Sequence, residues 1–451
     1  MNIFTRLWPA VGANDTRRTL ALFNWSASLR LWYDNIMVVS GFAFVNFALA
    51  LNIDREKVGY LVAVGFLACL LQPVGLLIAN TIREKKQFAL RISYCEPLCM
   101  MAMVVAVFFV PQAWRVPLVA AGVLLAAASV HTVKPMIDEW LASAIPAGIR
   151  ARYLGRRLQI VSIISVAAML LIGGITQGMT WITQHVPGIG SMGYGLLLIA
   201  GGSFGFAAVW VLRGAAMPST SVSARLSWSS APEVLRHAPF LRYLGAAIIY
   251  NTPFWLAAPY YQVFALTELR LPEIAIACCM CGYFILKILL LPLAGRWLDR
   301  LGPRLMIYLV SPLYVIFFLL YALASPERWW TVFIGWALIG IAEGGYSVAA
   351  TSALYSVVPE STARPAYFAV YNIATSLVGM AGAAMSAWML EHWLAHTSIT
   401  IGSLTLSHFQ LLFGISCALL IGCIFGTQLF PGKEPRKKQS GPRPQTALPA
   451  E

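Results

Sequence analysis

The sequence predicts an all-α membrane protein of twelve transmembrane helices, arranged as two pseudo-symmetric six-helix bundles. Composition is the first observation: 59% of the 451 residues are apolar and 11% are charged, whereas a soluble protein carries about 25% charged residues. The second is that the apolar residues form long continuous runs, which a β-barrel with its alternating pattern would not show. The third is a repeat between the two halves of the chain. Together they exclude a water-soluble enzyme and a disordered chain.

Twelve stretches have the length of about 20 mainly apolar residues that a helix needs to cross the hydrocarbon core. They cover residues 28–50, 58–80, 88–110, 116–139, 157–180, 192–213, 241–265, 273–294, 305–324, 329–356, 365–390 and 409–430. We therefore expect a cytoplasmic N-terminal segment (1–27), a first bundle (28–213), a cytoplasmic linker (214–240), a second bundle (241–430) and a disordered cytoplasmic tail (431–451).

The repeat consists of residues that recur in the same order at a nearly constant offset. Asn35 recurs as Asn251, 216 positions later, and Pro97 recurs as Pro312, 215 positions later. Duplicated halves are common in membrane transporters, so the repeat supports two bundles of six helices.

The distribution of Lys and Arg predicts the orientation, because cytoplasmic loops are enriched in these residues. With the N-terminus inside, 24 of the 32 basic residues fall in or beside inner loops and tails, five fall in outer loops, and three lie within spans (Arg30, Lys134 and Lys287). The net charge of +14 is then a topology signal, and we expect no nucleic-acid partner. The predicted protein is a monomer surrounded by lipid in a bacterial inner membrane, with both termini cytoplasmic.

A motif lies between the eighth and ninth spans, where GRWLDRLGPR predicts a loop over 295–304. It has the spacing G-x-x-x-D-R-x-G-x-R, formed by Gly295, Asp299, Arg300, Gly302 and Arg304. With this motif the chain resembles the major facilitator superfamily of transporters, whose signature loop has the same pattern. The corresponding first-half loop, LLIANTIREKK, departs from it, since Asn80 stands in place of the acid and Arg83 in place of the glycine.

The resemblance implies that spans one, four, seven and ten line a central cavity and that a small solute crosses by alternating access. The motif also has its own physical rationale. A carboxylate that faces arginines at the cytoplasmic mouth can form a charge-assisted latch between moving parts. We therefore expect Asp299 to act in a cytoplasmic gate.

Charged residues inside the spans are the main site candidates, because each costs roughly 2.5–3.5 kcal/mol at a helix centre and usually faces a cavity or a partner. In span ten, Trp336, Gly340, Glu343 and Ser347 lie on one helical stripe. This spacing predicts a cavity face with Glu343 as a proton site. The alternative is a structural acid that is hydrogen-bonded to a neighbouring helix.

Span four carries His131, Lys134 and Asp138 on one face, which predicts a polar cavity wall. Lys134 and Asp138 are four residues apart and can pair; the alternative is a snorkelling lysine beside interfacial acids. In span one, Arg30 and Asp34 can also pair. We interpret Arg30 as an interfacial anchor and Asp34 as a proton-site or gate candidate.

Lys287 in span eight has no residue of opposite sign within four positions. Its partner must therefore come from another helix or from an anionic substrate, or the lysine must lose its proton. Glu343 is the expected partner. Asn251 and Trp255 in span seven are polar and aromatic groups suited to recognising a small solute. Glu96 in span three is expected to make a structural pairing.

These features predict a secondary active transporter, coupled to protons through Glu343 or Asp34. The chain has no G-x-x-x-x-G-K-[ST] phosphate loop, so ATP is not the expected energy source. One alternative is a transporter-like receptor or assembly factor that no longer transports. Another is a membrane-embedded enzyme, which the absence of H-E-x-x-H and G-x-S-x-G motifs disfavours. We expect no catalytic residues, no cofactor and no metal, since the eight cysteines lie in spans as small apolar side chains.

Overall fold

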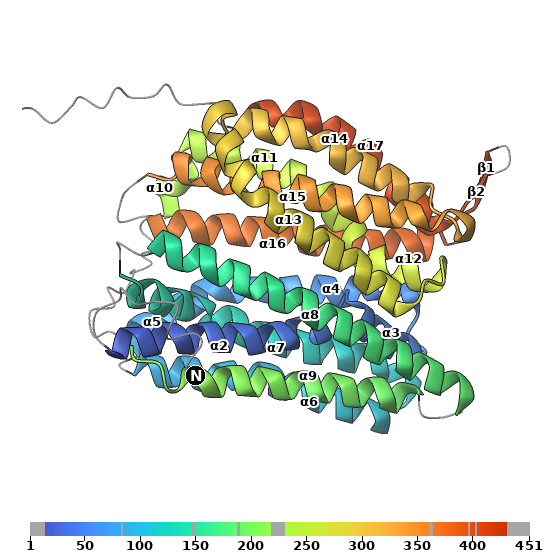
Figure 1. Cartoon of the computed structure of the whole chain (residues 1–451), viewed down its shortest axis with the longest axis horizontal. Coiled ribbons are helices and arrows are strands. Elements are labelled where there is room, and N and C mark those ends of the chain that lie inside the picture. Colours follow the sequence, from blue (N-terminus) through green and yellow to red (C-terminus); the bar gives the residue numbers. More distant parts are fainter. Residues whose placement is uncertain are drawn as a thin grey trace, which may run out of the picture.

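The computed structural model describes residues 14–82, 84–146, 150–186, 190–217, 231–359, 364–395, 397–401 and 404–430. Long helices run side by side along the molecule, with the first half of the chain below and the second half above in Figure 1. Within the described residues, 11 helical stretches are long and apolar enough to cross a membrane. The all-α membrane fold is therefore confirmed.

The helices of the first half follow the predicted spans. They are α2 (Asn14–Met37), α3 (Phe42–Ala50), α4 (Val58–Leu67), α5 (Gln72–Thr81), α6 (Lys85–Ala106), α7 (Gln112–Ala144), α8 (Arg150–His185) and α9 (Gly190–Leu212), with short 3-10 turns η1 (Arg55–Lys57), η2 (Ala68–Leu71) and η3 (Val107–Phe109).

The second half begins with the short helix α10 (Ala231–Arg236), within the predicted linker. Its further helices are α11 (Ala238–Ala257), η6 (Ala258–Tyr260), α12 (Tyr261–Thr267), α13 (Glu273–Leu301), α14 (Pro303–Ala322), η7 (Pro326–Arg328), α15 (Trp330–Val357), α16 (Arg364–Trp388), the π-helical turn η8 (Met389–Trp393), α17 (His408–Gly426) and η9 (Thr427–Leu429). Strands β1 (Ile399–Ile401) and β2 (Leu404–Leu406) form an antiparallel hairpin between η8 and α17.

The two ends of the molecule carry different elements. The hairpin end carries β1 and β2, and the linker end carries α10, at the opposite side of Figure 1. The predicted tail at 431–451 lies outside the described residues, as does the middle of the predicted linker, 218–230.

Two predicted boundaries are wrong. The first helix begins at Asn14 rather than at residue 28, so half of the predicted N-terminal segment is helical. The loop expected at 295–304 is helix α13 up to Leu301, followed at once by α14. The apolar run of this span ends near residue 294, but the helix continues through polar residues as far as Leu301. The turn consists of Gly302, whose φ of 80° lies in the left-handed region that favours glycine.

The repeat is visible in the helix geometry. The first helix of each half is interrupted near its middle, at residues 38–41 between α2 and α3 and at η6 between α11 and α12. Pro97 lies inside α6 and Pro312 lies inside α14, each in the third span of its half. Matching interruptions at matching positions support the duplication.

The two halves pack through α8 against α13 and through α4 against α16. Small residues allow this close approach: a Cβ added at Gly173 of α8 would lie 2.5 Å from the Cβ of Ala277 on α13. Further along, the thiol of Cys281 contacts the carbonyl oxygen of Val166 at 3.4 Å. The bundles are therefore tightly joined toward the hairpin end, where α13 begins.

Candidate functional site

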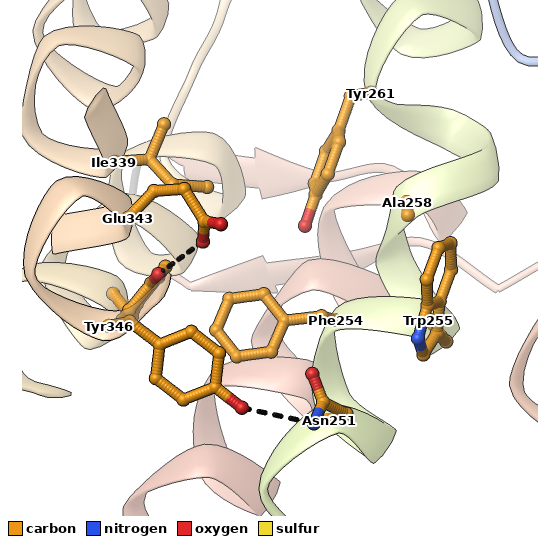
Figure 2. A pocket seen from close by; sticks show the side chains of 9 residues that line it. Asn251, Phe254, Trp255, Ala258, Tyr261, Ile339, Glu343 and Tyr346 are labelled. Carbon is orange, nitrogen blue, oxygen red and sulfur yellow. Dashed lines mark hydrogen bonds between the residues drawn. The ribbon is translucent and has the colours of Figure 1, made fainter. Parts of the chain in front are cut away.

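A cavity of about 240 Å³ opens in the second half, lined by α11, η6, α12, α14 and α15. Five of its nine lining residues are aromatic. The lining consists of Asn251, Phe254, Trp255, Ala258, Tyr261, Tyr314, Ile339, Glu343 and Tyr346. Figure 2 shows Glu343 on one side of this space and α11 on the other. An apolar pocket with a few convergent polar groups is the usual form of a small-molecule site.

Glu343 is held by two partners from two other helices. Its Oε2 accepts a hydrogen bond of 2.7 Å from the hydroxyl of Tyr314 on α14, and its Oε1 lies 3.4 Å from Nζ of Lys287 on α13. Lys287 also donates to the hydroxyl of Tyr283 at 3.2 Å. The Lys287 and Glu343 side chains are 28% and 30% exposed. The expected pairing of the two charges is thus present, and it ties α13, α14 and α15 together.

Close helix packing explains why this pair can form. A Cβ added at Gly340 of α15 would lie 3.0 Å from Cα of Tyr283 on α13, and one at Gly344 would lie 3.4 Å from the carbonyl oxygen of Lys287. Glycines at these two positions bring α13 against α15. The Lys287 ammonium therefore reaches a carboxylate across the helix pair, although none lies within four residues of it in the sequence.

The predicted cavity stripe of span ten is wrong in part. Trp336 is 9% exposed, and its indole N–H donates to the hydroxyl of Tyr321 at 2.7 Å, so it packs among helices outside this cavity. Gly340 faces α13, as described above. The cavity is lined instead by Ile339, Glu343 and Tyr346. Because α15 packs against α13 and α14, the face of α15 that lines the cavity is rotated by about one residue from the predicted stripe.

The two polar and aromatic positions expected in span seven do line the cavity. The Asn251 amide donates to the carbonyl oxygen of Ala247 at 2.7 Å and to the hydroxyl of Tyr346 at 3.1 Å. Both donor contacts are internal, which leaves the amide oxygen as the atom available to a ligand. Trp255 packs edge-on against Phe66 of α4 at 4.6 Å between ring centroids, so the cavity wall also contacts the first half.

A second cavity, of about 330 Å³, lies in the first half between α2, α6, α7 and α9, and its charged lining includes Arg157 near the start of α8. Arg30 lines this cavity and pairs with two acids: its Nε lies 2.8 Å from Oδ1 of Asp34, and its guanidinium makes two hydrogen bonds to Glu96, one of them 2.6 Å long. Glu96 is 7% exposed. Arg30 is therefore the partner of a buried acid and not an interfacial anchor, while Glu96 has the structural pairing expected of it.

The predicted triad of span four is divided. Lys134 and Asp138 both line the second cavity and pair at 3.3 Å, as expected from their spacing. His131 instead packs toward η2 and α5, where one ring nitrogen lies 3.1 Å from the thiol of Cys69 and the other 3.1 Å from the Gln72 amide. His131 lines neither cavity. Its expected role in the solute pathway stays a prediction.

The motif residues lie at the linker end, where α13 turns into α14. Asp299, Arg300 and Arg304 are exposed, and within the described part of the chain Asp299 forms no ion pair. Gly302 forms the turn, whereas Gly295 faces open space. The role of these motif residues as a latch stays a prediction.

Polar contacts between the halves gather at the hairpin end instead. Nη1 of Arg55 lies 2.6 Å from Glu268. Glu273, which is 4% exposed, accepts hydrogen bonds from Asn46 at 3.0 Å and from the hydroxyl of Thr180. These contacts were not predicted, because each joins residues more than 90 positions apart in the sequence, beyond the reach of helical spacing. They close this end of the molecule.

The fold and its cavities define a multi-helix membrane protein with the architecture of a transporter. Residues 243–451 match the sequence model described as Major Facilitator Superfamily. The second half of the chain is therefore similar to this superfamily, in agreement with the motif at 295–304. No curated protein matches the chain.

Solved structures share the fold over nearly the whole chain. A mutant form of the nucleoside transporter NupG has a TM-score of 0.71 at 12% identity, covering 92% of this chain and 100% of its own. The xylose transporter XylE from E. coli has a TM-score of 0.64 at 11% identity, covering 93% and 99%. An auto-inhibited POT family peptide transporter has a TM-score of 0.65 at 13% identity, covering 91% and 96%. At such identities the likeness concerns the fold alone.

Proposed function

We propose that this protein is a secondary active transporter that moves a small organic solute by alternating access and couples the movement to protons. One observation carries the proposal: a carboxylate, Glu343, lies on the wall of an aromatic cavity and is held there by Lys287 and Tyr314. A membrane-embedded carboxylate beside a cavity is the usual form of a proton site in transporters.

The geometry offers a simple coupling mechanism. When Glu343 is ionised, Lys287 and Tyr314 both bind it and hold α13, α14 and α15 together. When it takes up a proton, the ion pair with Lys287 is lost and one hydrogen bond to a charged acceptor becomes a weaker one to a neutral acceptor. Protonation therefore changes how strongly these three helices are joined, at the place where a solute would sit.

Alternating access needs two gates that close in turn. In this structure the hairpin end is closed by Arg55, Glu268 and Glu273. We propose that Asp299, with Arg300 and Arg304, closes the linker end when the hairpin end opens. The bundles at 28–213 and 241–430 would be the two moving bodies. Asp34, beside Arg30 in the second cavity, is a further proton-site candidate.

The excess of Lys and Arg at the linker end supports a cytoplasmic position for that end, and both termini would then be cytoplasmic. We propose a monomer in a bacterial inner membrane. Similar folds belong to proteins described as a nucleoside transporter, a D-xylose–proton symporter and a peptide transporter. Their solutes are all small, and one of them is coupled to protons, which supports the proposal.

Proton flux in proteoliposomes tests the function directly. Purified protein is reconstituted with a pH-sensitive dye inside, and solutes of different classes are added outside. We expect one class to cause proton movement, and Glu343→Gln to abolish it. The matched control is Glu327→Gln, the same chemical change at an exposed turn where the carboxylate accepts only from Ser325; it should transport normally.

Two results would contradict the proposal. Proton movement at the wild-type rate in Glu343→Gln would remove the proposed proton site. Specific solute binding with no flux of solute or protons would show instead a receptor with a transporter fold.

A further inference from the structure

We infer that the solute is an uncharged, planar heteroaromatic ring of about the size of a nucleobase, with hydrogen-bond donors and acceptors on one edge. It would lie in the second-half cavity and be recognised by Tyr261, Asn251 and Glu343. The inference rests on one part of the proposed function, namely that the solute binds in this cavity. Four features of the cavity lead to it.

The first feature is an unpaired hydroxyl. Tyr261 is 8% exposed, and its hydroxyl has no hydrogen-bond partner among the described residues. Figure 2 shows this hydroxyl directed from α12 into the space between Glu343 and α11. A buried hydroxyl without a partner costs about 1–3 kcal/mol. A ligand that supplies a carbonyl or a ring nitrogen acceptor would remove this cost.

The second feature is that the hydrogen-bonding groups face one another across the cavity. Asn251 donates both of its amide hydrogens to other residues of the protein. Only its oxygen, which is an acceptor, is left for a ligand. Glu343 is a carboxylate that accepts one hydrogen bond from Tyr314 and is 30% exposed. A ligand therefore meets two acceptors and one donor. An edge that carries N–H groups beside a carbonyl or ring nitrogen fits this arrangement.

The third feature is the charge balance. Lys287 and Glu343 neutralise each other, so a cation would add an uncompensated charge to a low-dielectric site. An anion would meet Glu343 before Lys287, because Glu343 lines the cavity and Lys287 does not. Both charged classes are disfavoured, and an uncharged solute is favoured.

The fourth feature is the wall. Phe254, Trp255, Tyr261, Tyr314 and Tyr346 surround the space together with Ile339 and Ala258. Aromatic faces suit stacking against a flat ring. A sugar would bring four or five hydroxyls into the cavity, and each hydroxyl left unpaired would be penalised. At about 240 Å³, the cavity is also smaller than the 300–1,000 Å³ typical of drug-sized ligands.

Equilibrium binding to the purified full-length protein tests the inference without any gradient. Adenine and uracil are titrated while tryptophan fluorescence is recorded, since Trp255 lines the cavity. Glucose and benzoate are the comparison ligands for the sugar and the anion. We expect at least one base to bind and the two comparison ligands to bind at least tenfold more weakly.

The decisive variant is Tyr261→Phe, which removes only the hydroxyl. Base affinity should fall about 5- to 15-fold, the value of one hydrogen bond to a neutral group. The variant should fold normally, because this hydroxyl has no hydrogen-bond partner in the part of the chain that the structure describes. The matched control is Tyr250→Phe on α11, whose hydroxyl bonds to Ser311 outside the cavity; it should bind the base as the wild type does.

The outcomes separate this inference from the proposed function. Failure of both bases to bind, tighter binding of glucose or benzoate, or unchanged affinity in Tyr261→Phe would overturn the inference. Coupled flux of glucose would overturn it while leaving proton-coupled transport intact. Base binding that depends on Tyr261 but produces no flux would keep the inference and contradict the proposed function.

Discussion

The pair formed by Lys287 and Glu343 makes a quantitative prediction about stability. The two charges lie 3.4 Å apart. At an effective dielectric constant of about 20, the attraction between two charges at this separation is about 5 kcal/mol before any desolvation cost. Desolvation offsets much of this gain. Because both side chains are less than one third exposed, we expect a net coupling of about 1–3 kcal/mol, the range for residues in direct contact.

The perturbation is a double-mutant cycle of Lys287→Met and Glu343→Gln. Lys287→Met leaves the Glu343 carboxylate with Tyr314 as its partner, and Glu343→Gln leaves the Lys287 ammonium with Tyr283. Each single variant should therefore lose about 2–3 kcal/mol, because a charge stays behind without its counter-charge. The double variant should lose little more than the worse single variant, since both charges leave together.

The assay is unfolding of the purified protein in detergent, followed by tryptophan fluorescence. The matched control is Lys57→Met with Asp54→Asn, an ion pair of 2.6 Å in which Asp54 is 62% exposed. Exposed pairs usually contribute less than about 1 kcal/mol, so this cycle should be nearly additive. If the Lys287–Glu343 cycle is additive within about 0.5 kcal/mol, the pair does not hold the helices together and the coupling mechanism loses its basis.

Two further predictions concern the buried acid of the first half and the two gates. Arg30→Met should cost about 3 kcal/mol in the same unfolding assay, because it leaves the buried carboxylate of Glu96 without a cation; a loss below 1 kcal/mol would show that Glu96 is neutral when buried. In a background that keeps Cys281 as the single cysteine, Glu273→Gln should weaken the closed hairpin end and increase maleimide labelling of Cys281, which is 6% exposed at the bundle interface. Asp299→Asn should weaken the opposite gate and reduce this labelling, so a change in the same direction in both variants would refute the two-gate model.

The sequence was sufficient for the parts of the fold that depend on short-range patterns. Among the described residues, hydropathy located the 11 helical stretches that are long and apolar enough to cross a membrane, because a helix in lipid needs a continuous apolar run. Helical spacing predicted the pairs Arg30–Asp34 and Lys134–Asp138, which lie on single helices. Hydropathy could not locate the end of α13. The residues after 294 are polar enough for a loop, but the helix continues through them as far as Leu301.

The same reasoning predicted only some of the residues that line the cavity. Asn251, Trp255 and Glu343 stood out because polar and aromatic groups inside an apolar span need an explanation. Tyr314 did not stand out, and the place of the Tyr261 hydroxyl in the cavity could not be predicted, because tyrosine is also common near membrane interfaces. Their roles depend on the contact between α12, α14 and α15, which no pattern within one helix encodes.

Isolated charged residues within the spans indicate contacts between helices. Lys287 had no acid within four residues of it in the sequence, and its counter-charge proved to be a carboxylate on another span. Glu96 was similar: its partner Arg30 lies 66 positions away. An isolated charge within an apolar span therefore predicts a contact between helices as well as a site, because leaving it unpaired in the membrane is too costly. The glycines at positions 340 and 344 mark where that contact forms, since only small residues let α13 and α15 approach closely. Isolated charges and nearby glycines, considered together, therefore strengthen a sequence prediction such as the Lys287–Glu343 contact, because the two signals are independent.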